Sequence, residues 1–219
     1  RALPALPELE RRHIRHSFYS QLTDTTVEVI RGSQLPPEFF VDRVAMREPE
    51  FLTEVSNNYQ QSVIVMTLHQ GNWEWMLQRA CAEYPIAGAA VYKRLHSEGA
   101  DRFTYENRAR FGTEPVEMRD AAKNIIRHRR SPRFIFMVAD QSPGQRERVH
   151  WVNFLHQPTA FFSGAAAIGR ATGFPIVFAG CVRTARGHYR IEFSEITRDP
   201  KSLSEQEIIQ RYAGLVEQT

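Results

Sequence analysis

Cysteine is scarce in this sequence of 219 residues, which contains only Cys81 and Cys181. Both stand in apolar surroundings, and neither belongs to a C-x-x-C pair. A disulfide framework is therefore not expected, and we predict two buried free thiols in a reducing compartment.

Long apolar runs are also missing. No stretch approaches the roughly eighteen apolar residues that a membrane-spanning helix needs. The chain begins with Arg1 and not with methionine, so a membrane anchor that precedes Arg1 remains compatible with the sequence.

Several catalytic and cofactor motifs are absent as well. The sequence has no G-x-S-x-G nucleophile motif, neither of the glycine-rich nucleotide motifs, and no H-E-x-x-H zinc motif. A serine hydrolase, a nucleotide-dependent enzyme and a zinc enzyme are not expected, and we predict no metal and no cofactor. Only the arginine run at 127–133 favours nucleic acid, and no recognisable nucleic-acid module accompanies it, so we predict no such partner.

The composition is that of one globular domain. Hydrophobic residues make up 42% and charged residues 24%, and a chain of this length supports one sizeable core. The formal net charge is only +3, but the 28 lysines and arginines allow local basic patches. Such patches would suit phosphates, anionic lipid or an acidic partner protein.

The most informative stretch is a junction near residue 70. Residues 62–68 form a short, nearly continuous apolar run with the length and composition of a buried strand. His69 ends this run, Gly71 permits a tight turn, and Asn72 can cap a helix that the apolar spacing predicts from residue 73 onward. A reactive side chain at such a bend is open to a cleft.

His69 and Glu74 lie on either side of this junction. In one continuous helix, five steps of about 100° would leave their side chains roughly 140° apart and unable to touch. With His69 at the strand end and Glu74 in the first helical turn, the carboxylate can fold back onto one imidazole nitrogen and leave the other free as a general base. Alternatively, Glu74 only stabilises the helix N-terminus, and the spacing alone does not separate the two.

This junction carries a resemblance to a known family. The sequence H-Q-G-N-W-E at 69–74 matches the H-x4-D/E signature of the lysophospholipid acyltransferase superfamily, and its H-x-G-N-W-E form is similar to the bacterial lipid A biosynthesis (late) acyltransferase branch. A V-Y-[KR]-like step at 91–93 and a D-Q-x-x-G element at 140–144 resemble the same branch in the same order.

Polar side chains end two further predicted strands. Lys93 and Arg94 follow a strand at 86–92, and Asp140 follows a strand at 134–139. If the strands are parallel, these side chains meet His69 at one carboxyl edge, where cations can bind anionic groups. A solvated loop and a simple turn are the alternatives, and the resemblance favours substrate binding.

The remaining pattern predicts helices and a hairpin. We expect the first helix to pack on the core, with a position on a membrane surface as the alternative, because basic residues cluster near its start. The predicted helices span 7–31, 37–45, 98–111, 120–130, 159–172 and 205–217, with an extended piece at 115–116 and a hairpin of strands at 174–182 and 189–196.

The resemblance implies a glycerol-3-phosphate acyltransferase-like fold. This fold is α/β, with a mixed, mostly parallel central sheet flanked by helices and an N-terminal helical segment. Because the resemblance covers nearly the whole chain, we predict a single acyltransferase domain over 1–219, with N-terminal helices in 1–60 and the α/β catalytic core in 61–219. The family normally continues with an aromatic and basic segment, so we expect the C-terminal end to be truncated.

The resemblance also implies an activity. An O-acyltransferase of this branch moves a fatty acyl chain from an acyl carrier protein or coenzyme A thioester to a hydroxyl of a lipid A precursor or related glycolipid, at the cytoplasmic face of the bacterial inner membrane. The carrier protein could dock on the arginine run at 127–133. His69 would be the general base and Glu74 its orienting partner, and the expected substrate-binding residues are Gly71, Asn72, Lys93, Arg94, Arg119, Asp140 and Gln141.

Two other functions remain open at this point. The same His-Glu pair could activate water, which would make the protein an acyl-thioesterase. His69 could instead be structural, in a noncatalytic module that binds lipid or a carrier protein. The sequence determines neither the acceptor nor the acyl chain length.

Overall fold

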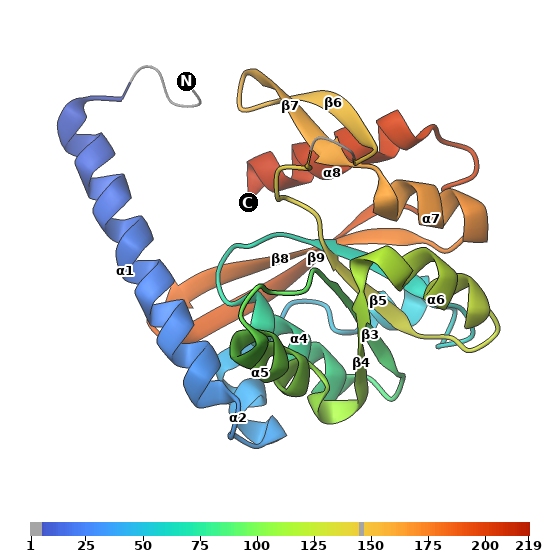
Figure 1. The fold of residues 1–219 in the computed structure, drawn as a ribbon, viewed down its shortest axis with the longest axis horizontal. Coiled ribbons are helices and arrows are strands. Elements are labelled where there is room, and N and C mark those ends of the chain that lie inside the picture. Colours follow the sequence, from blue (N-terminus) through green and yellow to red (C-terminus); the bar gives the residue numbers. More distant parts are fainter. Residues whose placement is uncertain (1–5, 145–146) are drawn as a thin grey trace.

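A computed structural model describes residues 6–144 and 147–219. Its centre is a seven-stranded sheet of order β1-β9-β8-β2-β5-β3-β4, with helices on both faces (Figure 1). All neighbouring strands are parallel except β8 and β9. The prediction of a mixed, mostly parallel α/β sheet flanked by helices, with an N-terminal helix, is confirmed.

The strands fall into two sheets. The main sheet consists of β1 (Val44–Met46), β2 (Val63–Thr67), β3 (Gly88–Tyr92), β4 (Thr113–Glu117), β5 (Phe134–Val138), β8 (Ile176–Ala185) and β9 (His188–Thr197), and an antiparallel hairpin consists of β6 (Val149–Phe154) and β7 (Gln157–Phe162).

The helices cover the two faces of the main sheet. In chain order they are α1 (Glu8–Gly32), α2 (Pro37–Arg43), α3 (Glu50–Val55), α4 (Trp73–Glu83), α5 (Glu98–Arg108), α6 (Ala121–Arg127), α7 (Gly164–Thr172) and α8 (Glu205–Gln218). Helices α2 and α4 contribute to the core on one face, and α6, α7 and α8 contribute to the core on the other.

Strand β2 lies in the middle of the sheet, and all five of its residues are buried. Ile64 belongs to the core of one face and Val65 to that of the other, which explains why the run is continuously apolar. The parallel register pairs Thr67 with Val138 of β5, so β2 and β5 end level at one edge. Residues that follow these strands therefore share the carboxyl edge of the sheet.

Helix α1 has nearly the predicted bounds, but its packing differs from the prediction. The expected core residues Leu9 and Phe18 are 78% and 59% exposed, and only Thr25 and Gly32 are buried along the helix. The prediction that α1 packs on the core is therefore wrong for its N-terminal part, which includes Leu9 and Phe18. The reason is geometric, because this part of the helix extends away from the sheet (Figure 1).

Two segments adopt a structure other than the predicted one. The predicted helix at 37–45 ends at Arg43, because the next three residues pair with β9 as an edge strand. The helix expected from Thr159 begins at Gly164, because residues 157–162 form β7 and pair with β6. Both corrections involve strand pairing, which local spacing does not reveal.

Within the described residues, no helix combines the length and the apolar character that crossing a bilayer requires.

Candidate active site

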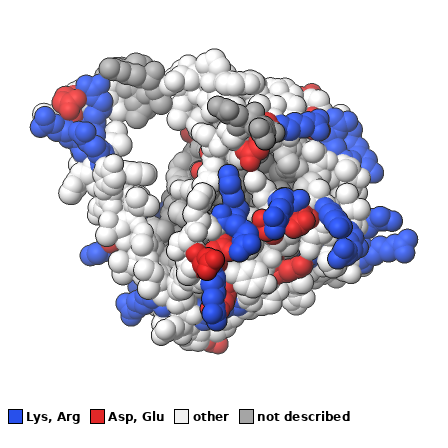
Figure 2. Space-filling view, in the orientation of Figure 1, with Lys and Arg blue, Asp and Glu red and all other residues white. Residues whose placement is uncertain are grey.

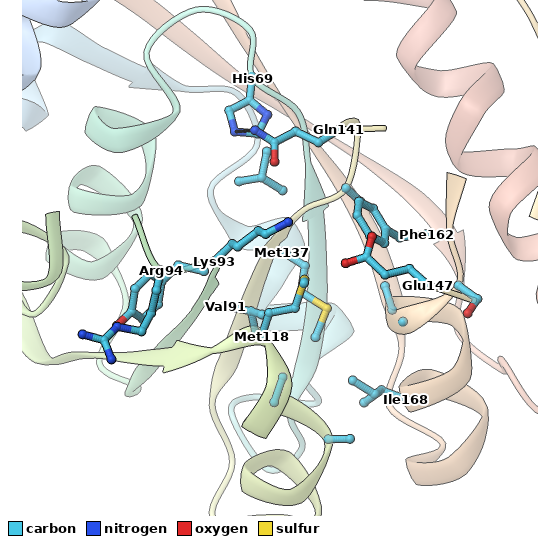
Figure 3. Close-up of a pocket in the computed structure, with 18 of the residues that line it drawn as sticks. His69, Val91, Lys93, Arg94, Met118, Met137, Gln141, Glu147, Phe162 and Ile168 are labelled. Atoms are coloured by element: carbon cyan, nitrogen blue, oxygen red, sulfur yellow. Dashed lines mark hydrogen bonds between the residues drawn. The ribbon is translucent and has the colours of Figure 1, made fainter. Parts of the chain in front are cut away.

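A cavity of about 840 Å³ lies at the carboxyl edge of the sheet and extends between α6 and α7. This volume is within the usual range for small-molecule sites. Figure 3 shows His69 and Gln141 at one end and Ile168 at the other, with Val91 and Met137 between them. The end at Ile168 is therefore apolar, and the charged side chains of Lys93 and Glu147 also line the cavity nearer His69.

His69 is held by Asp140, which follows β5. The imidazole Nδ1 lies 2.7 Å from Oδ1 of Asp140, and the backbone N–H of His69 donates to Oδ2 at 2.9 Å. The carboxylate thus fixes both the ring and the main chain of His69. With Nδ1–H donated to Asp140, the lone pair of Nε2 is available to accept a proton.

The pKa of the Asp140 carboxyl lies below its usual value. Burial opposes its ionisation, but the hydrogen bonds from the ring and backbone of His69 outweigh that effect. The group therefore stays a carboxylate near neutral pH, as an acceptor for Nδ1–H must.

Gln141 and Trp73 border the other side of the imidazole. The side-chain nitrogen of Gln141 lies 3.5 Å from Nε2 of His69, at the long limit of a hydrogen bond. The Trp73 ring packs edge-on against the imidazole, with ring centroids 4.8 Å apart. Nε2 therefore lies beside an amide and an aromatic wall.

Glu74 does not hold His69 as the junction predicted. Both residues lie in the described part of the chain, and the Glu74 carboxylate instead pairs with Arg108 of α5, with Nε and Oε2 3.0 Å apart. It also accepts a hydrogen bond from Trp73 Nε1 at 3.2 Å. The expected His69–Glu74 contact is wrong because a buried carboxylate binds the nearby guanidinium, while Asp140 already occupies Nδ1.

Gly71 and Asn72 belong to the turn between β2 and α4 and are not among the described residues that line the cavity. Gly71 has a φ of +60°, and a Cβ there would stand 2.1 Å from the carbonyl oxygen of Cys181. Asn72 is fully buried and caps α4 by accepting from Trp75 N at 3.0 Å. In the structure both residues support the turn, and their place at the substrate stays a prediction.

The expected cations divide into two groups. Lys93 and Arg94 line the cavity, and Figure 3 shows the Lys93 side chain pointing toward the His69 end. Arg94 also pairs with Asp101 at 3.2 Å. Arg119 is exposed and pairs with Glu117 at 2.9 Å, and it is not among the described residues that line the cavity.

Sequence reasoning missed two contributors to this site. Arg108 lies on a helix with many charges, and nothing in its spacing identifies Glu74 as its partner. Arg148 reaches the cavity from a segment between two elements, one of which was not predicted. Glu74 stands among the apolar residues of the predicted helix, and this is the one sequence signal that could have indicated a cationic partner such as Arg108.

A histidine bonded to a carboxylate, at the head of a largely apolar cavity with cations beside it, is suited to proton transfer on a ligand that has an apolar chain and an anionic group. The family described as bacterial lipid A biosynthesis acyltransferase matches residues 1–219. The chain therefore belongs to the bacterial lipid A biosynthesis acyltransferase family, which makes it an acyltransferase with a lipid acceptor. No curated protein matches its sequence.

Proposed function

We propose that the protein moves a fatty acyl chain from a thioester of an acyl carrier protein, or of coenzyme A, to a hydroxyl of a lipid A precursor or related glycolipid. The observation that carries this proposal is the His69–Asp140 pair at the open end of an apolar cavity of about 840 Å³. An acyl chain needs such a cavity, and its transfer to a hydroxyl needs a base at the end where the carbonyl lies.

In this mechanism Nε2 of His69 takes the proton of the acceptor hydroxyl while the hydroxyl oxygen attacks the thioester carbonyl. The carbon–sulfur bond then breaks, the new ester remains on the acceptor, and the imidazolium returns its proton to the departing thiolate. Asp140 keeps Nδ1–H oriented and stabilises the imidazolium. No other reactant is consumed.

Gln141 and Glu74 support this step in different ways. The Gln141 amide lies near Nε2 of His69. It can donate a hydrogen bond to the thioester carbonyl oxygen, which becomes negative as the hydroxyl attacks. Glu74 does not contact His69 directly. It accepts a hydrogen bond from the ring N–H of Trp73, and the Trp73 ring packs against His69. Glu74 is thus a positioning residue in our proposal.

The substrates occupy different parts of the cavity. The acyl chain lies between α6 and α7, along Val91, Met118, Met137 and Ile168. Lys93 and Arg94 hold anionic groups of the acceptor at the mouth. Arg127, Arg129 and Arg130 are exposed and offer a docking surface to an acidic carrier protein, whereas Arg133 is buried and pairs with Glu114 at 2.7 Å. The enzyme works at the cytoplasmic face of the bacterial inner membrane.

Release of free thiol from an acyl carrier protein thioester tests this proposal, with and without a lipid A precursor. We expect release that depends on the acceptor, and a loss of about 10²–10⁴-fold in His69→Ala. His96 lines the same cavity, so His96→Ala is the matched control and should retain most activity.

Two results would contradict the proposal. Release that proceeds equally without the acceptor would indicate an acyl-thioesterase. An absence of release by the wild-type chain on membranes that contain the acceptor would favour a noncatalytic binding module.

A further inference from the structure

The lysine, arginine and acidic side chains that line the cavity are of two kinds. Most of them have an ionic partner, and these pairs are Glu74–Arg108, Arg94–Asp101 and Arg148–Glu205. Among the described residues 6–144 and 147–219, Lys93 and Glu147 are the two that line the cavity and form no ion pair, either with each other or with another group. Two opposite charges that face one cavity without pairing leave room for a ligand that contacts both.

The neighbouring surface shows that ion pairs form readily in this part of the molecule. Basic and acidic side chains lie next to one another over α5 and the strands β3 and β4 (Figure 2). On α5, Arg102 pairs with Glu106 at 2.7 Å. The unpaired charges of Lys93 and Glu147 therefore distinguish the inside of the cavity from the surface around it.

Glu147 is held in place by Gly144, the glycine of the D-Q-x-x-G element. The backbone N–H of Glu147 donates to the carbonyl oxygen of Gly144 at 3.1 Å, and Oε2 of its carboxylate accepts from the Gly144 N–H. These two bonds leave Oε1 without a hydrogen-bond partner among the described residues. A carboxylate that is fixed through one oxygen offers the other as an oriented acceptor.

The two charges lie along the path that an acyl chain takes through the cavity. Figure 3 shows Lys93 and Glu147 directed into the cavity from opposite sides, between His69 at one end and Ile168 at the other. Lys93 follows β3 and Glu147 precedes β6, so two separate elements supply them. A chain with its carbonyl at His69 passes between these two groups before it reaches the apolar end.

Together the two charges favour a neutral polar group on the ligand. Glu147 repels a phosphate or a carboxylate, and Lys93 repels a cation. A plain methylene chain displaces water from both charges and gives them no hydrogen bond in return, which is unfavourable. A hydroxyl can donate to Glu147 and accept from Lys93, so it satisfies both.

We propose that Glu147 makes the protein selective for acyl chains that carry a hydroxyl group close to the carbonyl. Oε1 of Glu147 accepts a hydrogen bond from this hydroxyl, and one N–H of Lys93 donates to its oxygen, which leaves the other N–H groups of the lysine for the acceptor. The inference rests on the proposed function, which places the acyl chain in this cavity. Glu147 is a specificity-determining residue and takes no part in the proton transfer at His69.

Binding of neutral fatty esters tests this inference apart from acyl transfer. Methyl 2-hydroxydodecanoate, methyl 3-hydroxydodecanoate and methyl dodecanoate are each made to compete with a fluorescent fatty ester for the full chain. At least one hydroxy ester should bind the wild-type chain about tenfold more tightly than the plain ester, because it gains a hydrogen bond to a charged group.

Variants of Glu147 identify the group that recognises the hydroxyl. Glu147→Ala should lose the preference and bind the plain ester at least as well as the wild-type chain does. Glu147→Gln keeps a side-chain oxygen that accepts hydrogen bonds, so it should retain part of the preference. Glu106→Ala is the control, because it removes an exposed carboxylate that does not line the cavity. Thermal unfolding shows whether each variant is folded.

The same variants serve in the thiol-release assay with carrier protein thioesters. The wild-type chain should have a higher kcat/KM for a hydroxyacyl donor than for a plain acyl donor of equal length, and Glu147→Ala should remove the difference. If the preference in binding depends on Glu147 but no acyl transfer occurs, the proposed function fails and the selectivity of the cavity stands.

Three results would overturn the inference and leave the proposed function intact. The first is that neither hydroxy ester binds better than the plain ester. The second is a preference that persists in Glu147→Ala, because another group would then recognise the hydroxyl. The third is that Glu147→Ala alters only the KM for the glycolipid acceptor, which would assign Glu147 to the acceptor.

Discussion

Two carboxylates near His69 have different partners. Asp140 binds the ring and the backbone of the histidine, whereas Glu74 pairs with Arg108 in a setting where both side chains are largely buried. A buried charge that loses its partner is costly, although the intact pair itself adds little net stability. Arg108 is therefore needed mainly because Glu74 is present.

Arg108→Met should lower the free energy of unfolding by about 3 kcal/mol, because it leaves Glu74 buried and unpaired. Adding Glu74→Gln to it should restore part of the loss. Urea denaturation measures both. Arg102→Met on the same helix breaks an exposed pair with Glu106 and should cost less than about 1 kcal/mol. An equal effect of the two arginine substitutions would contradict the account of this pair.

Both cysteines are free in the structure, as predicted, and Cys181 is buried, whereas Cys81 is only partly buried. Burial raises the pKa of the Cys181 thiol to about 12 and that of Cys81 to about 11. A raised thiol pKa means that almost no thiolate is present at pH 8, and the thiolate is the reactive form. Both side chains should therefore be inert in the folded protein.

Ellman's reagent at pH 8 should thus detect almost no thiol in the native protein and two thiols per chain in denaturant. Rapid reaction of either cysteine under native conditions would show that the thiol is accessible and its pKa ordinary.

At the scale of elements, the junction between β2 and α4 depends on one glycine. Gly71 has a φ of +60°, where only glycine is unstrained, and it touches the backbone of β8. The sequence predicts this strand, turn and helix correctly from residues 62–77, because the signals are local. It does not predict the contacts that support the turn. Gly71 lies against the Cys181 backbone and Asn72 donates to Glu28, and both partners are distant in the chain.

Gly71→Ala should destabilise the protein by at least about 2 kcal/mol and abolish activity, because its Cβ would meet the Cys181 carbonyl oxygen at 2.1 Å. Thermal unfolding and the thiol-release assay measure the two effects. Gly99→Ala is the control: a Cβ there meets nothing within 4 Å, and alanine should stabilise α5 slightly. A Gly71→Ala protein as stable and active as Gly99→Ala would show that the turn tolerates a side chain.

At the scale of the whole molecule, the parallel register brings the site together. Thr67 pairs with Val138, so His69 and Asp140, which are far apart in sequence, follow neighbouring strand ends. The sequence predicts that the polar strand ends His69, Arg94 and Asp140 share a crevice. In the structure His69 and Arg94 line one cavity, and Asp140 binds His69 at its edge. Which carboxylate binds the histidine was not predictable, because strand order is a property of the entire sheet.

Hairpin β6–β7 shows the same limit. Its residues alternate only weakly between polar and apolar, and their pairing is visible only in three dimensions. Because this hairpin was not predicted, neither was the wall that Phe162 and Arg148 give the cavity.

The cavity between α6 and α7 should set the acyl chain length. Ile168→Phe fills the end remote from His69, and each methylene that loses its contact costs about 0.8 kcal/mol, or roughly fourfold in kcat/KM. We expect a preference for shorter acyl donors, measured with carrier protein thioesters of graded length. Ile126→Phe, on the exposed surface of α6, should leave the preference unchanged. An unaltered preference in Ile168→Phe would place the acyl chain elsewhere.

The central claim is that Asp140, and not Glu74, orients His69 as the base. Nitrogen-15 NMR of the histidine side chains tests it most directly, with the His69 signal identified by its absence in His69→Ala. At a pH where the ring is neutral, we predict that its proton lies on Nδ1 in the wild-type chain and in Glu74→Gln, and that Asp140→Asn disturbs this tautomer. A wild-type proton on Nε2, or a tautomer that changes in Glu74→Gln and not in Asp140→Asn, would contradict the claim.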